Sequence, residues 1–424
     1  MKIIYLNGAD IEGGAARAAT RLLKGVRAKG LDARLIVQRK SGNDPLVEGA
    51  VSLTERVLSR IRPTLEQLLC GLTPGKLRGP FCSALLPDVL PHRLAAMAPD
   101  IIHLHWVARM MRLETLERFQ APIIWTLHDS WPFTGGCYLP GDCNRYRDSC
   151  GVCPMLDSHR ERDLSRRIWE RKRRAWDSLN LIVIAPSTWM AAAARSSSLF
   201  RDRRIEVIPN GIDVTLYKPC DKPAARKRFN LPQDKKLILF GAKDATSDRN
   251  KGFHLLQAAL GELAAMEKGN RPELVLFGAE KPGVATEPGV KIHYLGWQGD
   301  DTSLAQLYSA ADLFVLPSLQ ENLPYTVMEA MACGTPCVAF DQGGVSDLVD
   351  HHENGYLARP YDPVDVANGI SWIFAHQERK VLLDGNSRRK IVAKFSLSKI
   401  TENHTKLYRE LILKQQQVTF PSAL

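Results

Sequence analysis

The chain has 424 residues, 45% of them hydrophobic and 24% charged, and this length exceeds what one ordinary hydrophobic core supports, so we expect two domains. No run of 18 or more apolar residues and no low-complexity tract is present, which excludes a bilayer-spanning helix and a disordered or fibrous chain. The formal net charge of +11 favours anionic ligands, phosphates or an acidic membrane face, and it indicates nothing finer.

Short apolar runs alternate with longer segments of helical period in both halves, which is typical of βαβ units and parallel sheets. In the first half the expected strands lie at 2–8, 32–38, 100–106, 122–129, 181–187 and 205–211. In the second half they lie at 236–242, 273–279, 290–297, 311–318, 335–340 and 355–360. Each set suits one doubly wound sheet. The predicted fold class is therefore α/β, with two Rossmann-like domains facing across a cleft.

The segment that joins the two sets, residues 208–232, is rich in proline, glycine and charge, as linkers between domains are. We predict an N-terminal domain at 1–211, a second domain at 212–390 and a C-terminal helical segment at 391–424. Only six residues precede the turn signal at Asn7 and Gly8, too few for a signal peptide, so we expect a cytoplasmic protein.

Basic residues concentrate in segments 56–79 and 160–176, where apolar residues also recur with helical spacing. We interpret both segments as helices with a solvated basic face. The alternative is contact with a phosphate or with an anionic membrane. No nucleic-acid recognition motif accompanies the charge, so we do not expect nucleic acid as a partner.

The first expected strand is followed by Gly13 and Gly14, ahead of a helix of small residues. Ligands of doubly wound sheets bind beyond the carboxyl ends of the strands, and there glycine allows a positive φ and close approach of the backbone. The helix N-terminus adds free N–H groups suited to a phosphate, although such loops are common. At the end of strand 122–129, His128 could bond a hydroxyl through a neutral imidazole, or could be a structural histidine.

Four of the nine cysteines fall within residues 137–153, and they are Cys137, Cys143, Cys150 and Cys153. The last two form a C-x2-C pair. Zinc prefers four thiolates in closed structural sites, and a cytosolic chain seldom keeps disulfides, so the insert predicts a structural zinc site. Ordinary reduced thiols and disulfides remain the alternatives, because the overall spacing is not that of a standard zinc finger.

A polar loop after strand 236–242 leads through Lys251 and Gly252 into a helix. The ammonium group of lysine is a compact charge that suits a pyrophosphate. The alternative is a solvated basic loop, and this alternative is stronger for Arg249 than for Lys251.

The stretch ENLPYTVMEAMACGTPCVAF, residues 321–340, holds two glutamates separated by seven residues. Pro324 suits the first position of a helix and Gly334 suits its end, which places Glu321 in the preceding loop and Glu329 in the second helical turn. Beside a helix N-terminus, these carboxylates could accept hydrogen bonds from the hydroxyls of a sugar and a ribose. Alternatively, Glu321 is a loop charge and Glu329 a surface residue of the helix.

This stretch resembles the E-x7-E signature of family-4 glycosyltransferases, which are retaining, nucleotide-sugar-dependent enzymes of the GT-B fold. The resemblance implies that Glu321 contacts hydroxyls of the donor sugar and that Glu329 holds the ribose of the nucleotide. It also implies that the backbone amides of Asn322 and Leu323 address the sugar and the distal phosphate. Pro324 departs from the glycine that many members have there and offers no N–H group.

The same resemblance implies roles for residues in the other loops. Lys251 would neutralise the departing diphosphate, helped by Arg249 or Lys243, because Ala242 occupies the place where an arginine is commonest. The loop of Gly13 and Gly14 would touch the donor phosphate and the acceptor.

Of the histidines near the strand ends, the resemblance favours His128 over His103 and His105 as the residue that contacts the donor. Asp129 could orient His128 or reach the acceptor. The cysteine-rich insert is similar to one found in relatives of the bacterial polysaccharide branch, and a metal there would fold a loop on the acceptor side.

The resemblance thus implies a retaining transferase that moves a sugar from a nucleoside diphosphate sugar to a polysaccharide or lipid-linked glycan. The second domain would bind the nucleotide, the first would bind the acceptor, and the C-terminal segment would cross back to the first. Catalysis would need no cofactor. We expect peripheral contact with the inner face of the cell membrane. The alternatives are a sugar-nucleotide epimerase of the same fold, or a noncatalytic protein that binds sugar nucleotides or glycans.

Overall fold

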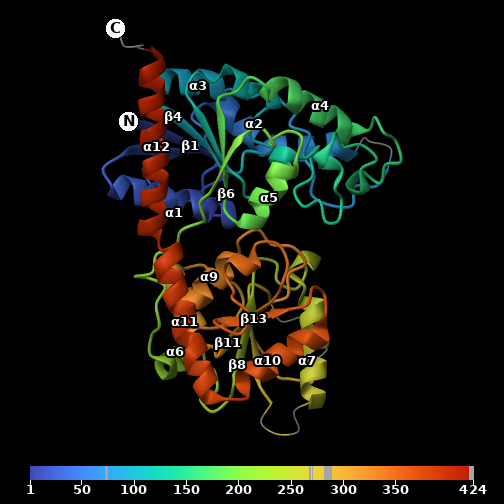
Figure 1. Ribbon diagram of the computed structural model, residues 1–424, viewed down its shortest axis with the longest axis vertical. Helices are drawn as coiled ribbons and strands as arrows, with labels where there is room; N and C mark the ends of the chain where they lie inside the picture. Colours follow the sequence, from blue (N-terminus) through green and yellow to red (C-terminus); the bar gives the residue numbers. More distant parts are fainter. Residues whose placement is uncertain (72–74, 267–268, 270, 281–288, 420–424) are drawn as a thin grey trace. The chain divides into compact units, whose positions relative to one another are not determined.

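The computed structural model describes residues 1–71, 75–266, 269, 271–280 and 289–419, and it divides the chain into two compact units (Figure 1). Unit 1 comprises Met1–Asn210 and Ile400–Leu424, and unit 2 comprises Gly211–Lys399. The first boundary thus falls one residue before the predicted one. The return to unit 1 begins at Ile400, not at residue 391, because residues 391–395 still form the end of a helix whose Ile391 and Phe395 are buried in unit 2.

Unit 1 contains a seven-stranded parallel sheet in the order β3-β2-β1-β4-β5-β6-β7. Its strands are β1 (Lys2–Ala9), β2 (Asp32–Arg39), β3 (Val47–Glu48), β4 (Ile101–Leu104), β5 (Ile123–Thr126), β6 (Leu181–Ala185) and β7 (Arg204–Val207). The sequence did not predict β3, because a strand of two residues has no detectable period. The helices of unit 1 are α1 (Gly14–Ala28), α2 (Leu53–Gly71), α3 (Leu90–Met97), α4 (Leu164–Trp176), α5 (Thr188–Ser196) and α12 (Leu397–Thr419).

Successive residues of the central strands alternate between two apolar cores, one on each face of the sheet. On one face, Ile3 and Tyr5 pack with α1 and with Ile400, Tyr408 and Leu411 of α12. On the other face, Ile4 and Leu6 join a core that contains Trp125, Trp131 and Trp176. The hydroxyls of Tyr5 and Tyr408 lie 3.0 Å apart, so the last long helix is part of this unit.

Unit 2 contains a six-stranded parallel sheet in the order β10-β9-β8-β11-β12-β13. Its strands are β8 (Leu237–Gly241), β9 (Glu273–Phe277), β10 (Ile292–Tyr294), β11 (Leu313–Leu316), β12 (Cys337–Phe340) and β13 (Gly355–Ala358). Its helices are α6 (Lys222–Arg228), α7 (Phe253–Met266), α8 (Asp301–Ala310), α9 (Tyr325–Ala332), α10 (Pro363–Phe374) and α11 (Gln377–Phe395). The prediction of two parallel α/β sheets is therefore confirmed.

The strand order of each sheet reverses direction at one point. In unit 2 the chain runs outward from β8 to β10 and then returns to place β11 on the other side of β8. In unit 1 the chain runs outward from β1 to β3 and then returns to place β4 on the other side of β1. Open α/β sheets bind ligands beyond the carboxyl ends of the strands at such a switch point. Within the residues that the structure describes, no helix has the length and apolar character to cross a membrane.

Candidate active site

The loops that follow β8 and β11 meet beside the switch point of unit 2. The amide of Leu319 donates to the carbonyl of Asn250 at 2.8 Å, and the Asn250 side chain donates to the carbonyl of Gln320 at 3.1 Å. Gly252 has a φ of +70°, and a Cβ atom there would lie 1.8 Å from the carbonyl oxygen of Pro317. Only glycine fits this contact, so the Lys251-Gly252 pair is explained by the packing of the two loops.

Lys251 and Glu321, which are 70 residues apart in the chain, form an ion pair across these loops. Lys251 lies in a short 3-10 helix, η5 (Arg249–Lys251), and its Nζ is 2.9 Å from Oε1 of Glu321. Their side chains are 25% and 17% exposed. The charge of Glu321 raises the pKa of Lys251, so the ammonium is held in its charged form. The sequence predicted that Lys251 contacts the diphosphate and that Glu321 contacts the sugar. The structure places these two side chains in direct contact with each other.

The backbone of Glu321 is fixed from the other side by two glycines. The amide of Gly344 donates to the carbonyl of Glu321 at 3.0 Å. Gly343 has a φ of +69°, and a Cβ atom at this position would lie 1.9 Å from the same carbonyl oxygen. Glu321 is therefore positioned by backbone contacts that do not depend on its side chain.

Helix α9 begins one residue later than predicted. Pro324 is its N-cap, with the extended dihedral angles φ −70° and ψ 121°, and the first helical residue is Tyr325. An N-cap residue keeps non-helical backbone angles, so the fixed φ of proline suits this position as well as the first helical one. Gly334 follows the helix with a φ of +76°, as predicted for its terminator. Asn322 and Leu323 lie in the loop just before the N-cap, half-buried and buried respectively.

Glu329 lies in the interior of unit 2. It is 2% exposed, and its Oε2 accepts a hydrogen bond of 3.1 Å from the hydroxyl of Tyr308 on α8. The alternative that Glu329 is a surface residue of the helix is therefore wrong. Its place four residues after Tyr325 puts it on the face of α9 that packs into the unit.

The two remaining basic candidates of unit 2 are exposed. Arg249 lies on η5, whose N-cap Asp248 accepts from the amide of Asn250 at 2.9 Å, and Lys243 lies earlier in the same loop. The structure does not bring either of them into the Lys251–Glu321 ion pair.

In unit 1, Gly13 and Gly14 lie in the loop after β1, beside the switch point. Gly13 is the N-cap of α1 and has a φ of 89°, a backbone angle that favours glycine. Lack of space is not the reason, because a Cβ atom at Gly13 or Gly14 would meet no atom within 4 Å. The loop is anchored by Asp10, whose carboxylate accepts from the amides of Ser41 at 2.9 Å and Gly42 at 2.8 Å. The two glycines thus border open space above an anchored loop.

His128 ends a column of stacked imidazoles. Its Nε2 lies 2.9 Å from Nδ1 of His105, the two ring centroids are 5.2 Å apart, and His105 stacks on His103 at 4.6 Å. His103 is buried and bonds Thr126 and Tyr408, so it has a structural role. Burial lowers the pKa of His128 to about 3, which keeps its imidazole neutral. His128 is the partly exposed member of the column, two residues beyond the end of β5.

Asp129 bonds neighbouring loops through both carboxylate oxygens. Oδ2 accepts from Nε1 of Trp106 at 2.7 Å and Oδ1 accepts from the amide of Trp131 at 2.9 Å. Burial raises the pKa of Asp129 to about 7. These contacts hold the segment that follows His128 in place.

Sequence reasoning missed Lys172, which is fully buried beneath this segment. Its ammonium donates to the carbonyls of Trp131 and Thr134 and lies 4.0 Å from the centroid of the Trp131 ring. Burial lowers the pKa of Lys172 to about 7. The available signal was its spacing: Lys172 comes four residues after Ile168 and four before Trp176, on the apolar face of α4.

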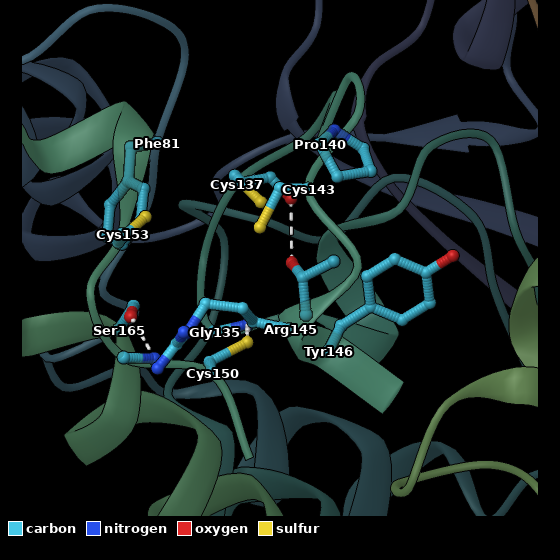
Figure 2. Close-up of a pocket in the computed structure, with 12 residues that line it drawn as sticks. Phe81, Gly135, Cys137, Pro140, Cys143, Arg145, Tyr146, Cys150, Cys153 and Ser165 are labelled. Carbon is cyan, nitrogen blue, oxygen red and sulfur yellow. Dashed lines mark hydrogen bonds between the residues drawn. The ribbon is translucent and has the colours of Figure 1, made fainter. Parts of the chain in front are cut away.

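The four clustered cysteines line one pocket together with Phe81 and Tyr146 (Figure 2). Sγ of Cys150 accepts a hydrogen bond of 3.1 Å from the amide of Gly135, and burial raises the pKa of this thiol to about 12. All nine cysteines are free thiols, so the disulfide alternative does not hold in this structure. Four thiols suit zinc chemically. Among the residues described, however, no three histidine, cysteine, aspartate or glutamate side chains are placed to hold one metal ion.

Comparison with known proteins gives family matches in both units. A model described as Glycosyltransferase Family 4 matches residues 12–216, and one described as Glycosyl transferases group 1 matches residues 235–376. D-inositol 3-phosphate glycosyltransferase of Nocardia farcinica is 26% identical over 300 residues, which is 66% of this chain and 60% of that enzyme. D-inositol 3-phosphate glycosyltransferase 2 of Catenulispora acidiphila is 28% identical over 322 residues, which is 71% of this chain and 69% of that enzyme.

Solved structures resemble the whole chain. Sucrose-phosphate synthase of Thermosynechococcus elongatus matches with a TM-score of 0.68 and 21% identity, covering 98% of this chain and 100% of that one. Anabaena HepE in complex with UDP-glucose matches with a TM-score of 0.63 and 18% identity, covering 97% and 100%. WaaG, a glycosyltransferase involved in lipopolysaccharide biosynthesis, matches with a TM-score of 0.64 and 16% identity, covering 96% and 99%.

Proposed function

The chain belongs to glycosyltransferase family 4 and has the GT-B fold, and from this premise we propose that it is a retaining glycosyltransferase. Its donor would be a nucleoside diphosphate sugar and its acceptor a polysaccharide or a lipid-linked glycan. The observation that carries the proposal is the Lys251–Glu321 pair, held on two joined loops beside the switch point of unit 2.

The pair explains how a donor could be received and activated. A diphosphate would compete with Glu321 for the ammonium of Lys251, because ion pairs with phosphate oxygens are strong and charge-assisted. Glu321 would then be available to accept hydrogen bonds from hydroxyls of the sugar. As the diphosphate departs, Lys251 and the N-terminal amides of α9 would stabilise the negative charge that develops on it.

Two further residues of unit 2 are proposed to contact the donor, and two places in unit 1 are proposed to contact the sugar or the acceptor. Glu329 would hold the ribose. For this, the hydroxyl of Tyr308 has to share or release the carboxylate of Glu329, to which it donates a hydrogen bond. Arg249 would approach the diphosphate from the exposed side of η5. In unit 1, the open loop at Gly13 and Gly14 and the neutral imidazole of His128 would contact the sugar or the acceptor.

The donor and acceptor classes draw support from the similar proteins. Anabaena HepE has been crystallised with UDP and with UDP-glucose, which supports a nucleoside diphosphate sugar as the donor. WaaG acts in lipopolysaccharide biosynthesis, which supports a glycan carried on a lipid. The curated relatives act on D-inositol 3-phosphate, and this compound is the competing acceptor that an assay has to include.

The experiment combines a donor panel with one substitution. One nucleotide sugar of a thermal-shift panel should raise the melting temperature, and that donor should support transfer to a lipid-linked glycan. Glu321→Gln should lower the transfer rate by about 100-fold, because it removes charged hydrogen bonds to the sugar worth about 1.5–3 kcal/mol. Affinity for the nucleoside diphosphate, which lacks the sugar, should change little. Glu353→Gln, at an exposed position of the same unit, is the matched control and should transfer at the wild-type rate.

Other results would favour other functions. Wild-type turnover by Glu321→Gln would remove the proposed role of this residue. A donor that binds but is neither hydrolysed nor transferred with any acceptor would indicate a noncatalytic binding protein. Release of a different free sugar without an acceptor would indicate an epimerase, and transfer to inositol 3-phosphate alone would replace the proposed acceptor.

No step of the proposed transfer passes through a metal, since Lys251 and the helix amides supply the positive charge that a metal would otherwise supply. We propose a structural zinc bound by Cys137, Cys143, Cys150 and Cys153. The proposal is supported by their convergence on one pocket, and it requires the thiols to move closer together than they lie in this structure.

A further inference from the structure

His105 lies behind His128, in the interior of unit 1 and directly after β4. Its backbone is fixed on both sides, because its amide donates to the carbonyl of Leu6 on β1 at 2.9 Å and its carbonyl accepts from Nε1 of Trp125 on β5 at 3.0 Å. Its imidazole stacks on the ring of His103 at a centroid distance of 4.6 Å and is 3% exposed. His105 is therefore held in one orientation and is too buried to contact a ligand itself.

The two nitrogens of the His105 ring have different surroundings. Nδ1 lies 2.9 Å from Nε2 of His128. Nε2 of His105 is buried and has no hydrogen-bond partner among the residues that the structure describes. Burial lowers the pKa of both rings, to about 3 in His128 and well below the usual value in His105. Each ring is therefore neutral and carries one N–H group.

Two arrangements of the protons can make the bond between these rings. In the first, Nδ1–H of His105 donates to Nε2 of His128, and the unpartnered Nε2 of His105 is a bare acceptor. In the second, Nε2–H of His128 donates to Nδ1 of His105, and the proton of His105 then sits on its Nε2, buried without an acceptor. Buried N–H groups that lack an acceptor are rarer in folded proteins than acceptors that lack a donor, so the first arrangement is favoured.

We propose that His105 is a positioning residue that fixes His128 as the tautomer protonated on Nδ1. The hydrogen bond at one nitrogen of a histidine determines which of its two nitrogens carries the proton. Because Nε2 of His128 accepts from His105, the N–H group that His128 offers to a ligand is at Nδ1, and Nε2 does not take a proton from a substrate. The consequence for sugar transfer rests on the proposed function, whereas the assignment of the tautomer does not.

The first test identifies the tautomer in the wild-type protein without donor or acceptor. Long-range ¹H–¹⁵N correlation spectra of protein labelled with ¹⁵N-histidine show, at neutral pH, which nitrogen of each imidazole is protonated. The signals of His128 are assigned by their loss in His128→Gln. We expect the tautomer protonated on Nδ1. A proton on Nε2 of His128 would overturn the proposal, whatever the effect of any substitution at His105.

Two variants of similar polarity separate the positioning role of His105 from its packing. In His105→Asn the amide nitrogen lies at the place of Nδ1, so a donor to His128 is kept. In His105→Gln the longer side chain carries its amide to the place of Nε2, away from His128. His128 should keep its single tautomer in His105→Asn and show a mixture of both tautomers in His105→Gln. The same single tautomer in both folded variants would mean that His105 does not set it.

Sugar transfer by the same variants measures the consequence. The kcat/KM of His105→Gln should lie about fivefold below that of His105→Asn, which is the effect of about one neutral hydrogen bond. The matched control is His92→Gln, at an exposed position on α3 of the same unit, and it should have the tautomer and the rate of the wild type. Far-UV circular dichroism and the melting temperature establish that each variant is folded.

The outcomes distinguish this inference from the proposed function. Equal kcat/KM in the two His105 variants, with different tautomers of His128, would overturn the consequence for transfer. A wild type that shows the Nδ1–H tautomer but transfers no sugar would contradict the proposed function and support the assignment of His105.

Discussion

At the scale of single residues, the candidate active site depends on one ion pair and on the glycines that allow it. Lys251 reaches Glu321 because Gly252 lets the loop after β8 touch the carbonyl of Pro317. Gly343 and Gly344 hold the backbone of Glu321 from the other side. The glycines therefore fix the backbone of both loops, and this backbone places Nζ of Lys251 2.9 Å from Oε1 of Glu321.

Replacement of Lys251 by alanine should weaken binding of the nucleoside diphosphate of the active donor. The change removes a charged partner of the diphosphate worth about 1.5–3 kcal/mol, which is roughly a 10- to 100-fold rise in Kd. It also leaves Glu321, whose side chain is 17% exposed, without its cation and facing the anionic ligand. Isothermal titration calorimetry measures the effect. Lys227→Ala, at an exposed position on α6, is the control and should bind like the wild type. Equal affinity for Lys251→Ala would contradict the assigned role.

At the scale of elements, the insert at 137–153 is a loop organised by backbone contacts and by its cysteines. Cys150, Gly151 and Val152 are consecutive residues with positive φ angles of 53°, 101° and 45°. The amide of Gly151 donates to the hydroxyl of Ser165 at 2.9 Å. Positive φ is costly at Cys150 and Val152, so the turn stores backbone strain that a metal bound by the neighbouring thiols would offset.

Elemental analysis of protein purified without added metal should find about one zinc per chain, bound by the four clustered cysteines. Zinc would offset the strain of this turn and draw the four thiols together, so a chelator should lower the melting temperature. The double variant Cys143→Ala, Cys153→Ala should lose the metal. Cys220→Ala, an exposed cysteine in unit 2, should retain it. Protein without zinc would mean that the insert holds ordinary reduced thiols.

At the scale of the whole molecule, α12 ties the end of the chain to the first strand of unit 1. Tyr408 bonds both Tyr5 and His103, and Glu410 binds Arg204 through two contacts of 2.6 and 2.9 Å. His404 stacks on His103 at 5.7 Å and so extends the histidine column. Unit 1 is therefore completed only when residues from opposite ends of the chain have come together.

The histidine column predicts that unit 1 loses stability in mild acid. Burial lowers the pKa of His404 to about 4, whereas an unfolded histidine has a pKa of about 6.5. Below pH 6.5 the unfolded chain takes up a proton that the folded chain refuses until about pH 4, so stability is complete above this window and falls as the pH falls through it. His404→Gln removes this proton uptake, and at pH 5 it should reduce the acid-induced loss by about 2 kcal/mol.

Urea unfolding at pH 7 and pH 5 measures this difference through tryptophan fluorescence. Six of the eight tryptophans lie in unit 1, so the signal reports mainly on that unit. The comparison is between the two pH values within each protein, which cancels any constant effect of the substitution on packing. An equal loss of stability in wild type and His404→Gln would contradict the role of this histidine.

Periodicity and spacing were sufficient for the architecture and for part of the site. Buried apolar runs bounded by loops predicted both sheets, because a strand covered on both faces must be apolar throughout. The loops after β8 and β11 were found for the same reason, since glycine, lysine and glutamate directly after such strands stand out. Strand β3 was missed because Val47–Glu48 is too short to show a period.

Spacing could not supply the contacts between distant residues or the direction in which a face points. The Lys251–Glu321 pair joins loops 70 residues apart, and the hydrogen bond between Tyr5 and Tyr408 joins opposite ends of the chain. For α2, the sequence showed an apolar side and a charged side but not which side is inward. That choice depends on where Glu66 and Arg62 find hydrogen-bond partners, and these partners are backbone groups of segment 82–87 that only the folded unit brings to the helix. Local pattern thus determined the elements, while the orientation of α2 and the ion pair of the site arose from tertiary contacts, because a buried charge is stable only where the fold supplies its partner.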